Sequence, residues 1–268
     1  MNSWLRTPDL VRLAVAQSPA GLDKTEDRIA WLRDALPDLT AKSIDLVLLP
    51  ELFLCGYNIG DTLADRAEPA DGPGFEAMRD LAQTSGIALH YGFAEADGTH
   101  LYNSALCISP DGTVLTHQRK LGIPPGFEQT HFTPGVGCSL FSYRGMRFAT
   151  LICYDAEFPE TVRHVASLGA EVVLVPTALG AQWGWVAHTM IPCRAYENGV
   201  YLAYANSAGS QNGMEFLGAS VIAAPGGAEA VRAGSEPEVI FADLDRAKVQ
   251  AAQARLPYLK DRLSLKLT

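Results

Sequence analysis

Two nearly continuous apolar runs, each ending in a proline and then a polar residue, constrain the fold of this chain most strongly. The first run covers 44–49 and leads to Glu51, and the second covers 172–175 and leads to Thr177. Such runs are typical of strands that are covered on both faces. The repeat of the pattern predicts two similar halves that pair within one layered domain.

Aliphatic runs alternate with helix-length amphipathic segments along the chain. We expect strands at 11–17, 44–49, 87–95, 101–109, 113–118, 148–153, 172–175, 200–206, 219–224 and 238–243. We expect helices up to about 41, and at 75–84, 159–168, 186–198 and 246–253. Asp23 with Glu26 three residues later indicates a capping box at the start of the first helix. Because both hairpins and helices link the strands, the class is mixed α/β.

Composition excludes several classes of protein. The 268 residues include 48% hydrophobic and 19% charged residues, which is typical of a folded chain with a large core. The net charge of −9 and the absence of a basic run argue against nucleic acid as a partner. No apolar stretch is long enough for a membrane span, and the first residues do not resemble a secretory signal. We therefore expect a cytoplasmic protein.

The five cysteines agree with that compartment. Their number is odd and no two form a CxxC pair, so neither a disulfide framework nor a cysteine zinc site is expected. A free cysteine is most often a small buried hydrophobe, and Cys107 in an apolar run fits that role. Cys153 differs because it ends a predicted strand.

Three polar residues stand at predicted strand ends: Glu51, Lys120 and Cys153. Each alone has an ordinary explanation, as a cap, a surface charge or a core thiol. A glutamate at the end of a buried strand nevertheless needs a partner, and a lysine can supply it. A cysteine beside that lysine would have its thiolate favoured, as a nucleophile requires.

The motifs around these residues are in the same order as in a known family. They are Pro50-Glu51-Leu52-Phe53 with Gly56-Tyr57, Arg119-Lys120-Leu121, Phe132-Thr133-Pro134-Gly135, Leu151-Ile152-Cys153-Tyr154-Asp155 with Glu157-Phe158-Pro159-Glu160, and Arg194-Ala195-Tyr196-Glu197-Asn198. With these motifs, nearly the whole chain resembles the nitrilase, or carbon–nitrogen hydrolase, superfamily. Within it the chain is most similar to amidases of short aliphatic amides, the 5-aminopentanamidases and R-stereoselective amidases.

The resemblance implies a four-layer αββα sandwich whose two pseudo-symmetric halves form one domain, at 8–255. The tail, 256–268, would pack at a subunit interface of a homodimer or higher oligomer, and no cofactor or metal is implied. Alternating apolar positions in the tail, Leu263, Leu265 and Leu267, fit this expectation.

The resemblance also implies an amidase mechanism. Cys153 would attack a small amide to form a thioester and release ammonia, with Glu51 as the general base. Lys120 and the backbone N–H of Tyr154 would stabilise the oxyanion. Glu128 matches a second family glutamate, which would orient Lys120 or the substrate nitrogen.

The same resemblance implies substrate contacts by Tyr57, Tyr154, Thr177 and Trp183. For Trp183 and the neighbouring Trp185, an aromatic core cluster is the competing interpretation. The chain departs from the pattern at Gly122, where many relatives have a histidine, so the shape of that loop is open.

Other functions stay open at this point. An N-carbamoyl amine hydrolase or a nitrilase of the same superfamily would share the three residues and differ only in its pocket. A non-catalytic scaffold with the same fold is the alternative outside enzymes, against which the intact Glu51, Lys120 and Cys153 argue.

Overall fold

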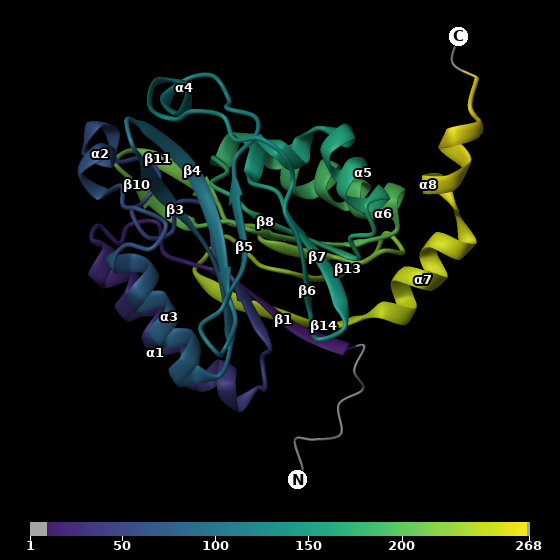
Figure 1. The fold of residues 1–268 in the computed structure, drawn as a ribbon, viewed down its shortest axis with the longest axis horizontal. Coiled ribbons are helices and arrows are strands. Elements are labelled where there is room, and N and C mark those ends of the chain that lie inside the picture. Colours follow the sequence, from purple (N-terminus) through teal and green to yellow (C-terminus); the bar gives the residue numbers. More distant parts are fainter. Residues whose placement is uncertain (1–9, 267–268) are drawn as a thin grey trace.

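Two six-stranded sheets form the centre of the computed structural model, which describes residues 10–266 (Figure 1). The first sheet has the order β14 (Glu238–Asp245), β1 (Leu10–Gln17), β2 (Leu46–Leu48), β3 (Ala88–Asp97), β4 (His100–Ile108), β5 (Val114–Arg119). The second has the order β6 (Leu140–Tyr143), β7 (Met146–Thr150), β8 (Val172–Pro176), β9 (Tyr201–Ala205), β12 (Val221–Ala223), β13 (Glu229–Arg232). The expectation that the first residues do not form a secretory signal concerns residues 1–9, which lie outside the described range.

The two sheets share one pattern of strand directions. Read from β14 to β5, the neighbouring pairs are antiparallel, parallel, parallel, antiparallel and antiparallel. Read from β6 to β13, the pairs follow the same sequence. The strand β2 therefore corresponds to β8, and these are the two strands whose apolar runs were recognised in the sequence. The predicted pseudo-symmetric halves are confirmed.

Helices cover the outer face of each sheet, which gives four layers (Figure 1). Helices α1 (Thr25–Ala41) and α3 (Pro73–Ser85) pack on the first sheet, and α5 (Pro159–Ser167) and α6 (Ile191–Asn198) pack on the second. In β2, Leu46 and Leu48 face the core between the sheets, whereas Val47 faces the helices. The strand is thus buried on both faces, and the predicted αββα sandwich is confirmed.

Shorter elements connect these layers. They are η1 (Gly60–Thr62), α2 (Leu63–Arg66), α4 (Phe127–His131), η2 (Cys153–Glu157), η3 (Ala181–Trp183), the π-helical η4 (Val186–Met190), β10 (Ala208–Gln211), β11 (Met214–Leu217), α7 (Arg246–Arg255), α8 (Tyr258–Asp261) and η5 (Arg262–Ser264). Strands β10 and β11 form a separate hairpin. Within residues 10–266, no helix is both long and apolar enough to cross a bilayer.

The expected capping box of the first helix is wrong. Helix α1 begins at Thr25, and its N-cap residue Lys24 makes no side-chain capping hydrogen bond. The Asp23 carboxylate instead accepts a hydrogen bond from Arg66, at 3.0 Å between Oδ1 and Nη2. An arginine from a distant segment therefore outcompetes the local backbone for this carboxylate.

The tail forms ordered structure against the second half of the molecule. Helix α8 contacts α5 and α6, and Leu259 packs on the core beneath those helices. The Tyr258 ring lies 6.3 Å from the Tyr196 ring, measured between centroids. Leu263 and Leu265 remain exposed, and Leu267 lies outside the described residues. The role of the tail at a subunit interface stays a prediction.

Candidate active site

The three predicted catalytic residues converge where strands of both sheets end. Glu51 follows β2, Lys120 follows β5 directly, and Cys153 opens the helical turn η2 after β7. The close approach of the Glu51 turn to β3 requires Gly92, because a Cβ there would lie 2.4 Å from the Leu52 nitrogen. The site thus depends on tight backbone packing.

One ammonium joins two carboxylates at the centre of the site. Lys120 Nζ lies 2.7 Å from Glu51 Oε1 and 2.7 Å from each carboxylate oxygen of Glu128. All three side chains are buried. When both carboxylates are ionised, one positive charge between two negative charges leaves this cluster with an excess of negative charge. Glu128 was expected to orient either Lys120 or the substrate nitrogen, and the structure places it against Lys120.

Asn103 donates hydrogen bonds to both Glu51 and Glu128, and the sequence analysis did not predict it. Its Nδ2 donates to Glu51 Oε1 at 2.7 Å and to Glu128 Oε2 at 3.1 Å. Its backbone oxygen accepts from the Lys120 N–H at 2.8 Å. A polar residue in a buried strand was the available signal, because such a side chain needs internal hydrogen-bond partners.

Tyr57 completes the surroundings of Glu128. The Tyr57 hydroxyl donates to Glu128 Oε1 at 2.8 Å. Burial, followed by the charges of Glu51 and Glu128, raises the pKa of this phenol, so it stays a donor. The Tyr57 ring contacts Phe127 and Phe216 at centroid distances of 5.8 and 6.3 Å. Tyr57 thus lies beside the cluster of Glu51, Lys120 and Glu128.

Cys153 has a strained backbone conformation. Its φ of 45° lies in the left-handed region, which costs energy for a residue with a side chain. Its side chain packs in the buried cluster with Ala105 and Ile152. Such strain aims a side chain into a site only where the surrounding structure holds the turn in place.

Lys120 favours the Cys153 thiolate as expected, but other effects outweigh it. Burial raises the pKa of the Cys153 thiol, the negative charge of Glu51 raises it further, and Lys120 lowers it less than these effects raise it. The expectation considered one cation, whereas the site holds two carboxylates as well. The balance of these effects favours the thiol over the thiolate, so attack by Cys153 would need a base.

Glu51 has the properties of that base. Burial raises its pKa to about 7, although the Lys120 charge opposes the shift. Its Oε1 is occupied by Lys120 and Asn103, but its Oε2 has no hydrogen-bond partner among the described residues. For Lys120, burial alone would lower the pKa, but the charges of Glu51, Cys153 and Glu128 raise it overall. The site therefore pairs a permanent cation with a carboxylate that can exchange a proton near neutral pH.

Thr177, from the second half of the molecule, lies close to Cys153. Its hydroxyl donates to the Tyr204 hydroxyl at 2.9 Å, and both side chains are fully buried. A side-chain hydrogen bond from Thr177 also lowers the pKa of Cys153, against the burial that raises it. The structure thus brings Thr177 to the cysteine.

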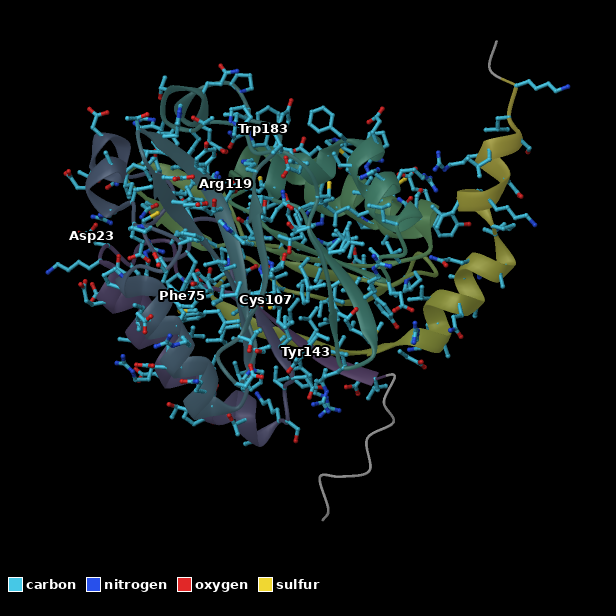
Figure 2. The ribbon with its side chains drawn as sticks, viewed as in Figure 1. Asp23, Phe75, Cys107, Arg119, Tyr143 and Trp183 are labelled. Carbon is cyan, nitrogen blue, oxygen red and sulfur yellow. The ribbon has the colours of Figure 1, made fainter. Side chains whose placement is uncertain are left out.

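The two tryptophans lie at the surface. The exposed fraction is 57% for Trp183, which is labelled in Figure 2, and 78% for Trp185. These values contradict the core cluster as an explanation. Tyr154 directly follows Cys153, and its ring meets Phe158 edge-on at 4.9 Å. Gly122 lies next to these two rings, since a Cβ there would be 3.4 Å from Tyr154 and 3.6 Å from Phe158. The substrate contact expected for Trp183 stays a prediction.

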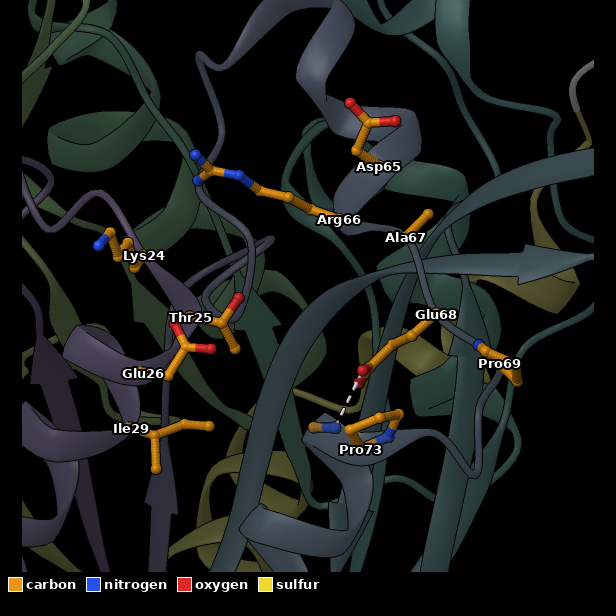
Figure 3. Close-up of a pocket in the computed structure, with 11 residues that line it drawn as sticks. Lys24, Thr25, Glu26, Ile29, Asp65, Arg66, Ala67, Glu68, Pro69 and Pro73 are labelled. Carbon is orange, nitrogen blue, oxygen red and sulfur yellow. Dashed lines mark hydrogen bonds between the residues drawn. The ribbon is translucent and has the colours of Figure 1, made fainter.

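Another hollow lies away from the catalytic cluster. A pocket of about 710 Å³ separates the start of α1 from the start of α3, and Glu68 in its wall accepts a hydrogen bond from the Gly74 N–H at 2.9 Å (Figure 3). None of the four predicted catalytic residues, Glu51, Lys120, Glu128 and Cys153, lines it. Within residues 10–266, no group of three or more His, Cys, Asp or Glu side chains is placed to hold a metal ion.

Comparison with known proteins assigns the family. Residues 12–254 match the model of the carbon–nitrogen hydrolase family. The chain belongs to the carbon–nitrogen hydrolase family. A hydrolase in the pqqF 5' region of Pseudomonas protegens is 39% identical, covering 84% of this chain and 80% of that protein. An (R)-stereoselective amidase of a Pseudomonas species is 36% identical, covering 83% of this chain and 81% of that protein.

Solved structures agree with this assignment. An amidase from a Nesterenkonia species is 31% identical and has a TM-score of 0.85, over 99% of this chain and 100% of the amidase. This carbon–nitrogen hydrolase is therefore an enzyme of the nitrilase superfamily, with amidases as its relatives in sequence and structure.

Proposed function

We propose that this carbon–nitrogen hydrolase cleaves short aliphatic primary amides to a carboxylic acid and ammonia through a thioester on Cys153. The observation that carries the proposal is the cluster of Lys120 between Glu51 and Glu128, with Glu51 Oε2 left unpaired beside a neutral cysteine. A neutral thiol, a nearby base and a fixed cation are the parts that acyl transfer needs.

Acylation follows from these positions. Glu51 takes the thiol proton as Cys153 Sγ attacks the amide carbon, and the carbonyl oxygen becomes an oxyanion. Lys120 and the Tyr154 N–H stabilise that oxyanion. The Lys120 ammonium already contacts three carboxylate oxygens, so its donation to the oxyanion uses an N–H that leaves one of the two Glu128 oxygens. The C–N bond then breaks, and the proton held by Glu51 leaves with the nitrogen as ammonia.

Deacylation uses the same groups a second time. Glu51, again a carboxylate, removes a proton from water, and the resulting hydroxide attacks the thioester carbon. The second oxyanion collapses, the C–S bond breaks, and Cys153 recovers its proton from Glu51 as the acid departs. Glu128 and Tyr57 keep Lys120 oriented in both steps, because Glu128 binds the ammonium with both of its oxygens.

An amide suits this site better than a nitrile. Attack on an amide places negative charge on oxygen, which a lysine can stabilise directly, whereas attack on a nitrile leaves a nitrogen that must be protonated. The similar Nesterenkonia amidase was solved in complex with butyramide, a short aliphatic primary amide. These two points support the amide class over the nitrile and N-carbamoyl alternatives.

A cationic end on the substrate is supported by charge. The net charge of −9 favours the approach of cations over anions. Glu157, four residues after Cys153, has a half-buried carboxylate that makes no hydrogen bond or ion pair within residues 10–266. Burial raises its pKa, while Lys120 and Arg194 lower it. A substrate ammonium would supply the missing partner, as in an amide of the 5-aminopentanamide type.

The experiment is a comparison of four substrates by product formation. We would assay 5-aminopentanamide, butyramide, an N-carbamoyl amine and butyronitrile side by side, with the Cys153→Ala variant as the blank. We expect ammonia from both amides at rates well above those from the other two compounds. Fastest turnover of the carbamoyl compound or of the nitrile would contradict the proposal.

We propose further that the enzyme works without a metal, in the cytoplasm and as a homodimer or larger oligomer. The five cysteines are all free, which supports a reducing compartment. Dialysis against a chelator should leave the rate unchanged. Activity that is lost on chelation and restored by zinc would contradict the cysteine mechanism.

A further inference from the structure

Asp155 lies between the two loops that carry the catalytic lysine and the catalytic cysteine. Its carboxylate is buried, and it accepts hydrogen bonds from three backbone N–H groups. Two of these belong to Leu121 and Gly122, directly after Lys120, and the third belongs to Ile152, directly before Cys153. Asp155 thus contacts the immediate chain neighbours of Lys120 and of Cys153.

The two carboxylate oxygens are divided between the two loops. Oδ1 lies 2.7 Å from the Gly122 nitrogen and 3.1 Å from the Leu121 nitrogen. Oδ2 lies 3.1 Å from the Ile152 nitrogen and 3.2 Å from the Leu121 nitrogen. One side chain thus joins the loop after β5, in the first sheet, to the turn after β7, in the second.

The cysteine turn needs such a constraint. Cys153 has a positive φ, and a strained conformation of this kind persists only where its surroundings determine it. The Asp155 N–H closes the turn on the Ile152 oxygen at 3.0 Å, and the Asp155 carboxylate returns a contact to the Ile152 N–H. These reciprocal bonds fix the backbone on both sides of the nucleophile.

The arrangement favours an ionised side chain with two equivalent acceptors. Burial raises the pKa of Asp155, whereas the backbone N–H groups of Gly122 and Ile152 and the charge of Lys120 lower it. A carboxylate can accept on both oxygens, but a carboxamide has one acceptor oxygen and one donor nitrogen. An asparagine of the same shape could therefore satisfy one loop and not the other.

We propose that Asp155 is a positioning residue whose carboxylate sets the separation and orientation of Lys120 and Cys153. It acts through the backbone and does not touch the reacting atoms. The inference rests on the proposed Cys153 chemistry. A misplacement of catalytic groups by about 1 Å can cost about 100-fold in rate, so a link of this kind controls turnover.

The test is the Asp155→Asn variant, with Asp45→Asn as a matched control. The Asp45 carboxylate also accepts a backbone N–H, from Arg12 at 2.8 Å, but it lies at the opposite end of β2 from Glu51. With butyramide, we expect Asp155→Asn to lower kcat about 100-fold while KM changes less than about threefold. We expect Asp45→Asn to retain the wild-type kcat.

A purely structural role predicts a different result. If Asp155 only filled space, the near-isosteric asparagine would keep kcat. If the substitution only reduced the amount of folded enzyme, the active fraction would fall, but the pH profile and the alkylation rate of the folded molecules would not change. We also expect iodoacetamide to alkylate Cys153 about tenfold more slowly in folded Asp155→Asn, since Glu51 would no longer be aligned with the thiol. Unchanged kcat and unchanged alkylation would overturn the proposal.

Two further measurements separate the possible failures. If Asp155→Asn does not fold, hydrogen exchange in the wild-type enzyme should still find the Leu121 and Gly122 amides protected, and rapid exchange at both would overturn the proposal. If turnover requires Cys153 but Asp155→Asn keeps the wild-type kcat, only the positioning role is refuted. If turnover survives Cys153→Ala, the proposed function itself is refuted.

Discussion

The backbone N–H of Glu51 donates a hydrogen bond to the carbonyl oxygen of Thr177, with 3.3 Å between nitrogen and oxygen. Glu51 follows β2 and Thr177 follows β8, which are corresponding strands of the two sheets. Glu51, the proposed general base, therefore lies in direct backbone contact with the other half of the molecule. Both sheets must be packed together before the site exists.

The first prediction concerns pH. Because acylation needs Glu51 as a carboxylate and its pKa is raised to about 7, kcat/KM should fall as the pH drops through about 7. The Asn103 hydrogen bond lowers the pKa of Glu51, so Asn103→Ala should move this acidic limb to higher pH and reduce the rate. Rate profiles from pH 5 to 9 measure both effects. An acidic limb that stays in place in the variant would contradict the role of Asn103.

How much the sequence predicts can be judged from particular residues. The long apolar strands and the positions of Glu51, Lys120 and Cys153 followed from the sequence, because burial on both faces and polar strand ends leave local signals. Asn103 and the acceptor role of Asp155 did not, since their partners lie up to 52 residues away in the chain. The pKa of Cys153 also depends on charges that only the fold brings together.

Short elements were missed for a related reason. Strands β6 and β13 and the hairpin of β10 and β11 are four residues each and have no continuous apolar run. The hairpin is held by its neighbours, since the Leu217 N–H donates to the Leu179 oxygen and Gln211 accepts from the Tyr57 N–H. Tertiary contacts rather than local preference determine such segments.

The second prediction concerns the buried charge at Lys120. Lys120→Ala should abolish turnover and also lower the free energy of unfolding by about 3–5 kcal/mol, because it leaves Glu51 and Glu128 buried without their cation. The loss of stability should shrink at acidic pH, where Glu51, whose pKa is raised to about 7, becomes neutral. Urea unfolding at pH 5 and pH 8 measures this, with the exposed Lys24→Ala as the control. A deficit that is equal at both pH values would contradict the account.

The third prediction concerns packing under Glu51. Gly92→Ala would place a Cβ 2.8 Å from the Glu51 Cα, so the turn that carries the base must move. We expect kcat to fall at least about tenfold, since general-base catalysis depends on this alignment. Gly226→Ala is the control, because a Cβ there meets nothing within 4 Å. Equal activity of the two variants would show that the close approach is unimportant.

The fourth prediction concerns assembly. Exposed apolar side chains lie on the α5, α6 and α8 side of the molecule and in the tail, namely Phe158, Leu168, Tyr196, Tyr258, Leu263 and Leu265. Because such a surface favours association, sedimentation equilibrium should find at least a dimer at micromolar concentration. Replacing both Leu263 and Leu265 with lysine should weaken it. A single species of 28.8 kDa for the wild type would contradict the prediction.

The central claim is that Cys153 carries the acyl group. The most direct measurement is turnover of butyramide in the presence of hydroxylamine, which competes with water for a thioester, followed by mass spectrometry of the acid-quenched enzyme. We predict butyrohydroxamate in constant ratio to butyrate, a butyryl group on the peptide that contains Cys153, and neither product from Cys153→Ala, while Cys193→Ala behaves as the wild type. Butyrate formation without hydroxamate, at a rate that Cys153→Ala preserves, would contradict the account.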